Sequence, residues 1–351
     1  MPKRRHRRCI SRLAAPLLAL VPLASGCSSA RTIEDQRPPR VGAVLERTGT
    51  EIMVAGELIH TGAPVVLWFD PGGYDAYRVT RRFARPDQRS WDAIKDALPS
   101  PNRYNDRPGK PEDGWNREQL AGVVDQFVIH YDVAGASRSC FRILHDMRGL
   151  SVHFLLDVDG TIYQTLDVTE RAWHATKANS RSVGIEIAQI GAYPPGEPET
   201  LDTWHDTDAK GTFITFPGWL GDGGVRTPNF VARPARDQRI RGVIQGRELE
   251  QYDFTDEQYE SLIRLTAALN AALPEIRLDY PRDATGDLLT QAMTGDDFDA
   301  FTGLIAHYHI QTNKIDPGPA FDWDRVVNGA RSLRAQPAPS APRPASRNRR
   351  R

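Results

Sequence analysis

The order of strand and helix patterns in the middle of the chain constrains the fold more than any other feature. A short apolar run, Phe127–His130, is followed by apolar residues at helical spacing in Arg138–Arg148. Two further strand patterns, Val152–Leu156 and Thr161–Gln164, flank a glycine-containing turn and predict a hairpin. Strands and helices in this order predict a mixed α/β fold, with a central mixed sheet flanked by helices.

The segment Ser182–Ala188 predicts another strand of this sheet. Val183, Ile185 and Ile187 alternate with smaller or polar residues, so Glu186 projects from the face opposite these three branched side chains. An isolated glutamate usually pairs with a surface cation. In the middle of an apolar strand, however, an unpaired charge is costly, and this favours a specific role for Glu186.

A capping box predicts the start of a long helix at Thr255. Thr255 and Gln258 have the spacing of this motif, and a periodic apolar face continues from Tyr259 until Pro274. The preceding stretch, residues 193–251, is rich in glycine and proline and is interpreted as an insertion with small elements of its own.

The N-terminus has the pattern of an export signal. A basic start is followed by the apolar run Leu13–Leu23 and by Ala24-Ser-Gly before Cys27. This resembles a bacterial lipobox, in which the cysteine is lipidated; the alternative is a chance cysteine behind an ordinary signal peptide. We expect an exported protein of the cell envelope, held by a lipid on Cys27 at the outer membrane and facing the periplasm.

Composition divides the chain of 351 residues into segments and excludes some functions. The chain has 45 Lys+Arg and 45 Asp+Glu residues, so its formal net charge is zero. Overall charge therefore gives no indication of binding to nucleic acid. Apart from Cys9 and the lipobox Cys27, which belong to the export signal, Cys140 is the one cysteine, and this excludes an intramolecular disulfide and a cysteine-rich zinc site. The expected segments are a signal peptide (1–26), a tether (27–40), a small β-rich N-terminal extension (41–115), a main domain (116–330) and a disordered basic tail (331–351).

A polar cluster at Ala306–Pro319 is either a metal and catalytic corner or an ordinary loop. Zinc hydrolases hold the metal with about three protein ligands, and imidazole and carboxylate suit this ion. His307 and Asp316 flank a turn, and His130 at a strand end could be the third ligand. His309 is a rival for His307, because two residues this far apart on an extended strand point the same way.

Five ordered motifs resemble those of the zinc-dependent N-acetylmuramoyl-L-alanine amidases of the type-2 family. Peptidoglycan recognition proteins and bacteriophage amidase lysozymes share that fold. The similarity runs discontinuously over about half the chain and leaves out the N-terminal extension and the insertion. The motifs are Ile129-His130, Ser151–Gln164, Trp173-His174-Ala175, Ser182–Glu186 and His307 with Lys314–Pro319.

The resemblance implies a role for each of these polar residues. His130, His307 and Asp316 match the family's zinc ligands, and its register favours His307 over His309. Glu186 matches the catalytic glutamate, which exchanges protons with the attacking water and the leaving amine. Lys314 matches a lysine whose ammonium stabilises the developing oxyanion.

Two motif positions bear on the substrate and on the mechanism. Trp173 and His174 lie where the family lines its substrate cleft, although a structural role for His174 is an open alternative. Phage-type members carry a catalytic tyrosine immediately before His153, where this chain has Val152. We expect Glu186 to fill that role and His153 to be structural.

The sequence thus predicts zinc-dependent hydrolysis of the amide between N-acetylmuramic acid and L-alanine, in peptidoglycan or muropeptides. Two alternatives remain at this point. A peptidoglycan-binding module without turnover would keep His130, His307 and Asp316 and would be indifferent to the loss of Glu186. A zinc peptidase acting on stem peptides would keep all four residues and differ in the cleft.

Overall fold

The computed structural model describes residues 47–78, 80–83 and 103–336. The predicted signal peptide, the tether with Cys27, and residues 337–351 of the predicted tail lie outside the described residues. Within the described ranges, none of the helices combines the length and the apolar character needed to cross a membrane.

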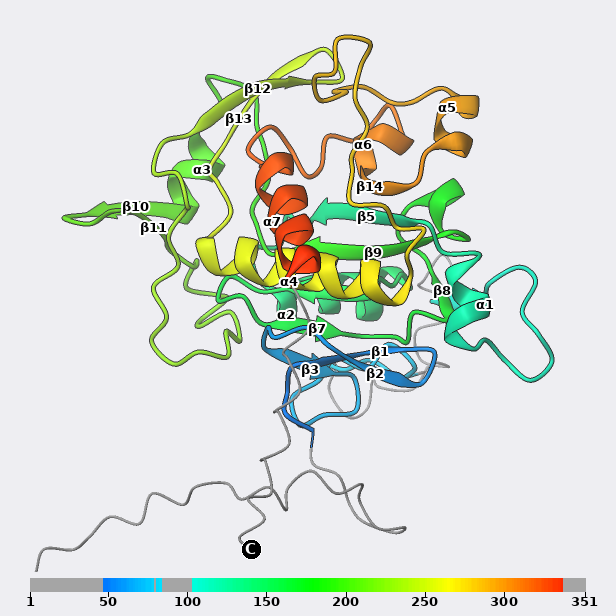
Figure 1. Ribbon diagram of the computed structural model, residues 1–351. Coiled ribbons are helices and arrows are strands. Elements are labelled where there is room, and N and C mark those ends of the chain that lie inside the picture. The colour runs from blue at the N-terminus through cyan, green and yellow to red at the C-terminus, as the bar shows by residue number, and fades with distance from the viewer. Residues whose placement is uncertain (1–46, 79, 84–102, 337–351) are drawn as a thin grey trace, which may run out of the picture. The chain divides into compact units, whose positions relative to one another are not determined.

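A six-stranded mixed sheet forms the centre of the fold (Figure 1). Its strands, in spatial order, are β14 (Gly303–Ala306), β5 (Gln126–Tyr131), β9 (Ser182–Ile187), β6 (Phe154–Leu156), β7 (Ile162–Gln164) and β3 (Val65–Leu67). The first four run parallel to one another, β7 is antiparallel to β6, and β3 is parallel to β7. This architecture confirms the predicted mixed α/β class and the predicted β6–β7 hairpin.

Helices cover both faces of this sheet (Figure 1). On one face lie α4 (Asp256–Ala272) and α7 (Trp323–Ala335), which pack against each other; α2 (Ser137–Phe141) lies behind the sheet and continues as the π-helical segment η5 (Arg142–Arg148). The predicted capping box begins α4, since the Thr255 hydroxyl accepts from Gln258 N at 3.0 Å and Gln258 Oε1 accepts from Thr255 N at 2.9 Å. Shorter helices are α1 (Arg117–Ala121), η6 (Thr176–Ala178), α5 (Gly295–Ala300) and α6 (His307–Ile310).

The two central strands divide their side chains between two environments. Phe127 and Ile129 of β5, and the three branched residues of β9, belong to the main core together with side chains of α4 and α7. The residues between them, including His130 and Glu186, face the opposite side because side chains alternate along a strand. The structure therefore agrees with the expected orientation of Glu186.

The N-terminal extension is part of this fold. It forms a hairpin of β1 (Glu51–Val54) and β2 (Glu57–His60), adds β3 to the sheet edge, and pairs β4 (Tyr104–Asp106) with β8 (Glu170–Ala172). Arg107 follows β4 and is 1% exposed. Its guanidinium donates to four backbone carbonyls, of Val168, Asn179, Ser180 and Ser182.

The insertion at residues 193–251 contains helix α3 (Glu199–Trp204) and two hairpins. The first pairs β10 (His205–Asp208) with β11 (Gly211–Ile214) and projects away from the sheet in Figure 1. The second pairs β12 (Ile240–Ile244) with β13 (Arg247–Gln251) and contacts the segment that follows β14.

One predicted boundary needs correction. We assigned the tail to begin at residue 331, but helix α7 continues to Ala335. Val326, Val327 and Ala330 are buried in this helix, so its last turn extends an element already packed on the core. The tail can begin no earlier than Gln336.

Candidate metal centre

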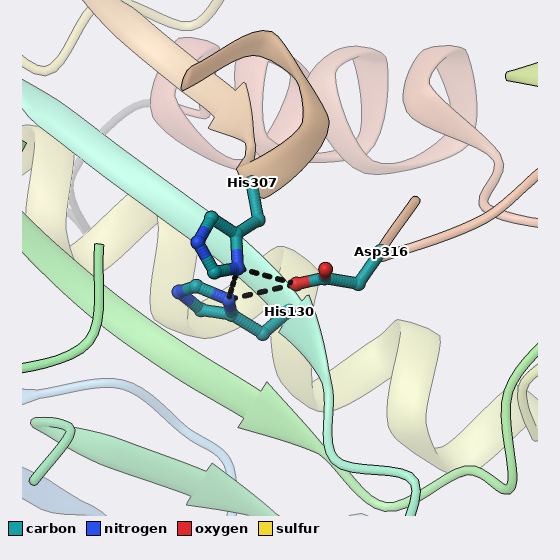
Figure 2. Close-up of side chains that lie close together, drawn as sticks. All are labelled: His130, His307 and Asp316. Carbon is teal, nitrogen blue, oxygen red and sulfur yellow. Dashed lines mark hydrogen bonds and ion pairs between the residues drawn. The ribbon is translucent and has the colours of Figure 1, made fainter. Parts of the chain in front are cut away.

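Three predicted ligands converge at the carboxyl edge of the parallel strands (Figure 2). His130 lies near the end of β5, and His307 directly follows β14, whose last residue, Ala306, pairs with Ile129. Asp316 comes from the loop before α7. His130 Nδ1 lies 2.8 Å from Asp316 Oδ2 and 3.0 Å from His307 Nδ1. His307 Nδ1 lies 3.0 Å from Asp316 Oδ2.

Burial and the neighbouring side chains set the protonation of His130 and Asp316. Burial and the neighbouring His307 lower the pKa of His130 to about 4, so its imidazole is neutral at neutral pH. Burial alone would raise the pKa of Asp316, but His307 and the hydrogen bond from His130 outweigh it and hold that pKa well below its ordinary value. Neutral imidazoles and an ionised carboxylate are the forms that bind a metal ion.

The outer nitrogens of both imidazoles have partners of their own. His307 Nε2 lies 2.8 Å from Gln311 Oε1, which can only accept, so this nitrogen carries the proton. His130 Nε2 lies 3.0 Å from His174 Nδ1. Partners at the outer nitrogens leave the two Nδ1 atoms, which both face Asp316 Oδ2, as the ligand atoms for a metal ion, an arrangement typical of metal-binding histidines.

The donor set fits a zinc ion. Without a cation, the contacts of the two Nδ1 atoms with Asp316 Oδ2 need a proton on an imidazole, and a metal ion bound by all three atoms would take the place of that proton. Tetrahedral zinc with bonds of 2.0–2.1 Å separates its ligand atoms by about 3.3 Å, so the ligand atoms of His130, His307 and Asp316 need to move apart by only a few tenths of an ångström. Three protein ligands leave a position for water or substrate.

His309 is not part of this cluster. We expected His307 and His309 on an extended strand, but the structure places them on the single turn α6, where residues two apart point about 200° from each other. His309 Nδ1 accepts from Ala306 N at 2.9 Å, and its Nε2 faces Leu289 O. The expectation of a strand was wrong, and the helical turn separates the two histidines.

Glu186 lies beside the cluster, on the neighbouring strand. In the sheet register it pairs with His130, and both side chains are on the face away from α4 and α7. Its side chain is half-buried. Burial, with a further contribution from the charge of Asp316, raises its pKa well above the ordinary value. A carboxylate of this kind is a strong proton acceptor close to the candidate ligands.

A cavity of about 520 Å³ reaches the cluster at His307, and His130, Asp316 and Glu186 are not among the residues that line it. Four predicted site residues line it: Trp173, His174, His307 and Lys314. The positive charge of Lys314 contributes to lowering the pKa of both His130 and Glu186. A second cavity of about 570 Å³, over the insertion near Arg239 and Tyr252, contains no predicted site residue.

The Trp173-His174 pair has structural partners as well as a place in the cavity wall. Trp173 Nε1 donates to Asn105 Oδ1 at 2.6 Å. The imidazole of His174 lies against the backbone of Gly184, where a Cβ atom would approach His174 Cε1 to 2.4 Å. Glycine at this position of β9 therefore makes room for His174 beside His130.

The neighbouring positions Val152 and His153 are both buried. Val152 packs in an apolar cluster with Phe141 and Leu155, so it contributes no polar group to the site. His153 Nδ1 accepts from Gly184 N at 3.1 Å, as suits the structural role expected for it.

Sequence reasoning missed several residues of the site. Gln311 orients His307, and Arg148, Arg171 and Asn313 line the cavity. Gln311 is four residues after His307, so a helical interpretation of this segment would have indicated it. The arginines lie in segments whose local pattern gives no sign of the cavity.

Comparison with known proteins gives a family. Residues 120–319, more than half of the chain, match the family described as N-acetylmuramoyl-L-alanine amidase. No curated protein matches the chain.

Several solved structures are similar to the chain, with low scores. A selenomethionine derivative of AmpD has 19% identity and a TM-score of 0.31, covering 65% of this chain and 89% of that one. AmiD from E. coli, in complex with anhydro-N-acetylmuramic acid-L-Ala-D-γ-Glu-L-Lys, has 17% identity and a TM-score of 0.32, covering 65% of each chain. The endolysin LysCS from Clostridium intestinale has 14% identity and a TM-score of 0.30, covering 59% and 83%.

Proposed function

The chain belongs to the N-acetylmuramoyl-L-alanine amidase family, and from this premise we propose that it is a zinc-dependent enzyme acting on peptidoglycan or muropeptides. The bond cleaved is the amide between the lactyl group of N-acetylmuramic acid and L-alanine. The observation that carries the zinc dependence is the buried cluster of His130, His307 and Asp316, whose ligand atoms lie within 4.8 Å of one another.

Zinc held by these three residues would polarise the scissile carbonyl and activate a water molecule for attack. Glu186 accepts a proton from the attacking water and returns it to the departing nitrogen of L-alanine. The Lys314 ammonium stabilises the negative charge that develops on the carbonyl oxygen. Gln311 holds His307 in the tautomer with its proton on Nε2, and His174 is the neighbour of His130 Nε2.

The charge of the cavity suits the proposed substrate. Arg148, Arg171 and Lys314 line it. In a peptide stem with a γ-linked glutamate the α-carboxylate is free, so the substrate carries negative charge away from the scissile bond. Arginine binds carboxylates well because its planar fork can donate two parallel hydrogen bonds. These cations are suited to the carboxylates of a stem peptide.

We also propose export and anchoring through a lipid on Cys27, on the evidence of the N-terminal sequence alone. Radiolabelled fatty acid fed to expressing cells should enter the intact protein and should not enter a Cys27→Ser variant. Labelling of both proteins, or of neither, would contradict the anchor.

The proposed reaction is tested with purified protein and soluble muropeptides. We expect free peptide and lactyl-bearing sugar as products, loss of activity with a zinc chelator, and recovery when zinc is restored. A Glu186→Gln variant should bind zinc normally but release product at least about 100-fold more slowly. If the variant releases product at the unmodified rate, Glu186 has no part in catalysis. Binding without cleavage identifies a recognition module, and cleavage within the stem identifies a peptidase.

A further inference from the structure

The hairpin β12–β13 of the insertion contacts the chain directly beyond Asp316. Gln251, at the end of β13, has a fully buried side chain. Its Nε2 donates to Pro317 O at 3.1 Å, and its Oε1 accepts from Ala320 N at 3.1 Å. One side chain thus fixes both ends of the turn that follows Asp316.

The same hairpin contacts the chain directly beyond His307. Gln245 lies in the turn between β12 and β13, and its Nε2 donates to Tyr308 O at 2.7 Å and to Gln311 O at 3.2 Å. Its own backbone N donates to Thr290 O at 2.9 Å, which ties the turn to a further segment. Because Gln311 is the partner of His307 Nε2, this contact supports both the backbone and the imidazole of His307.

Two glycines allow the hairpin to lie this close. A Cβ atom on Gly318 would approach Gln251 Oε1 to 2.1 Å, and a Cβ atom on Gly242 of β12 would approach Pro319 Cβ to 2.8 Å. Both distances are shorter than ordinary van der Waals contact. The hairpin and the segment after Asp316 are therefore packed against each other without space for a larger residue on either side.

We propose that Gln251 and Gln245 are positioning residues that set the spacing of His307 and Asp316, and that the insertion exists in part to supply them. Each glutamine binds the carbonyl of the residue immediately after a ligand: Tyr308 after His307, and Pro317 after Asp316. This inference rests on the proposed zinc binding at these residues.

The segment between the two ligands needs such support. After β14 ends at Ala306, the backbone leaves the sheet, and one backbone hydrogen bond, from Tyr308 N to Asp316 O at 3.3 Å, joins its two ends. Met293 N also donates to His309 O at 2.8 Å, inside the segment, but a single long hydrogen bond constrains the two ligand-bearing ends only weakly. The side-chain amides from the hairpin add three donor contacts at the two ligand-bearing ends.

The experiment compares three substitutions of similar shape: Gln251→Met, Gln245→Met and Gln164→Met. Gln164 of β7 is a matched control, because it is also fully buried and its Nε2 donates to two carbonyls, of Met53 and Leu166, at 2.7 and 2.9 Å. It lies on β7, which is three strands away from β5 in the sheet order. Zinc affinity is measured by competition with a chromophoric chelator, and thermal stability is measured on the zinc-free proteins.

We expect Gln251→Met and Gln245→Met to weaken zinc binding about 10- to 100-fold, the range seen when partners of metal ligands are lost. Gln164→Met should lower the melting temperature at least as much and leave zinc affinity within about twofold of the unmodified chain. If Gln251→Met fails to fold, the half-buried Gln245 decides the question.

Two kinds of result would overturn the inference: one rejects the positioning role of the glutamines, and the other rejects zinc binding itself. Zinc affinities that fall equally in all three variants, or that do not change in Gln251→Met and Gln245→Met, show that the hairpin is only structural. Absence of zinc binding by the unmodified chain overturns the proposed function and this inference together.

Discussion

The two halves of the candidate site are held in place by different means. The strand-held half consists of His130 and Glu186, which lie on adjacent parallel strands, where the backbone ladder fixes their spacing. The loop-held half consists of His307 and Asp316, which lie outside the sheet and whose neighbouring carbonyls bind side chains of the insertion. The contrast shows that a regular sheet can position reactive groups by itself, whereas a loop needs contacts from elsewhere in the chain.

The largest effect should come from removing a ligand from either half. We expect His130→Ala and Asp316→Ala each to lower kcat/KM by about 1,000-fold or more, because several kcal/mol of charge stabilisation disappear with the metal. Zinc content after dialysis and muropeptide turnover measure this. If either His130→Ala or Asp316→Ala keeps its zinc and its activity, the two halves do not form one metal site.

A smaller effect should follow from Lys314→Met, which changes the loop-held half without removing a ligand. We expect kcat to fall by about 100-fold with zinc content unchanged, because one group that stabilises the oxyanion is lost. Steady-state kinetics separate kcat from KM. A change confined to KM would assign Lys314 to substrate binding, and a Lys314→Arg variant serves as the control that retains the charge.

Gly184→Ala tests the strand-held half with one added methyl group. The new Cβ atom meets the His174 ring, so we expect His174 to move away from His130 and kcat/KM to fall by about tenfold. A crystal structure of the variant would show the displacement. The clash should also lower the melting temperature of Gly184→Ala, and the double variant with His174→Ala should recover part of that loss; equal melting temperatures would show that the clash with His174 is not the cause.

The smallest effect should be a difference in hydrogen exchange on removal of zinc. Amides of the loop-held half, such as Tyr308 N and Gly318 N, should exchange roughly fivefold faster in the zinc-free protein, equivalent to about 1 kcal/mol in local opening. Amides of β5 and β9 should not change, because the sheet holds them. If zinc removal speeds amide exchange equally in β5, β9 and the loop-held half, the two halves are not held by different means.

The strand-held half could be predicted from local patterns. Alternation in Ser182–Ala188 gave the orientation of Glu186, and the apolar run at Phe127–His130 gave the strand that carries His130. The capping box at Thr255 likewise predicted the start of α4. In these segments the period of the side chains reflects the layer they face, so the sequence contains the information.

The loop-held half was less accessible to sequence reasoning. The resemblance to amidases supplied His307 and Asp316 as ligands, but the local pattern suggested a strand where α6 forms a single turn. Gln245 and Gln251 act across long sequence separations, and isolated glutamines in a glycine-rich insertion have no distinctive pattern. Contacts of this kind are set by tertiary packing.

Strand β3 covers one edge of the central sheet, so a fragment that lacks it exposes β7. The family match begins at residue 120, which invites a shortened protein that starts there. Such a fragment would leave β7 unpaired on one side and would remove Arg107 from the carbonyls that it satisfies. An uncovered strand edge is a template for association with other chains. We therefore expect the fragment to self-associate, and a fragment that keeps β3 and Arg107 to stay in solution.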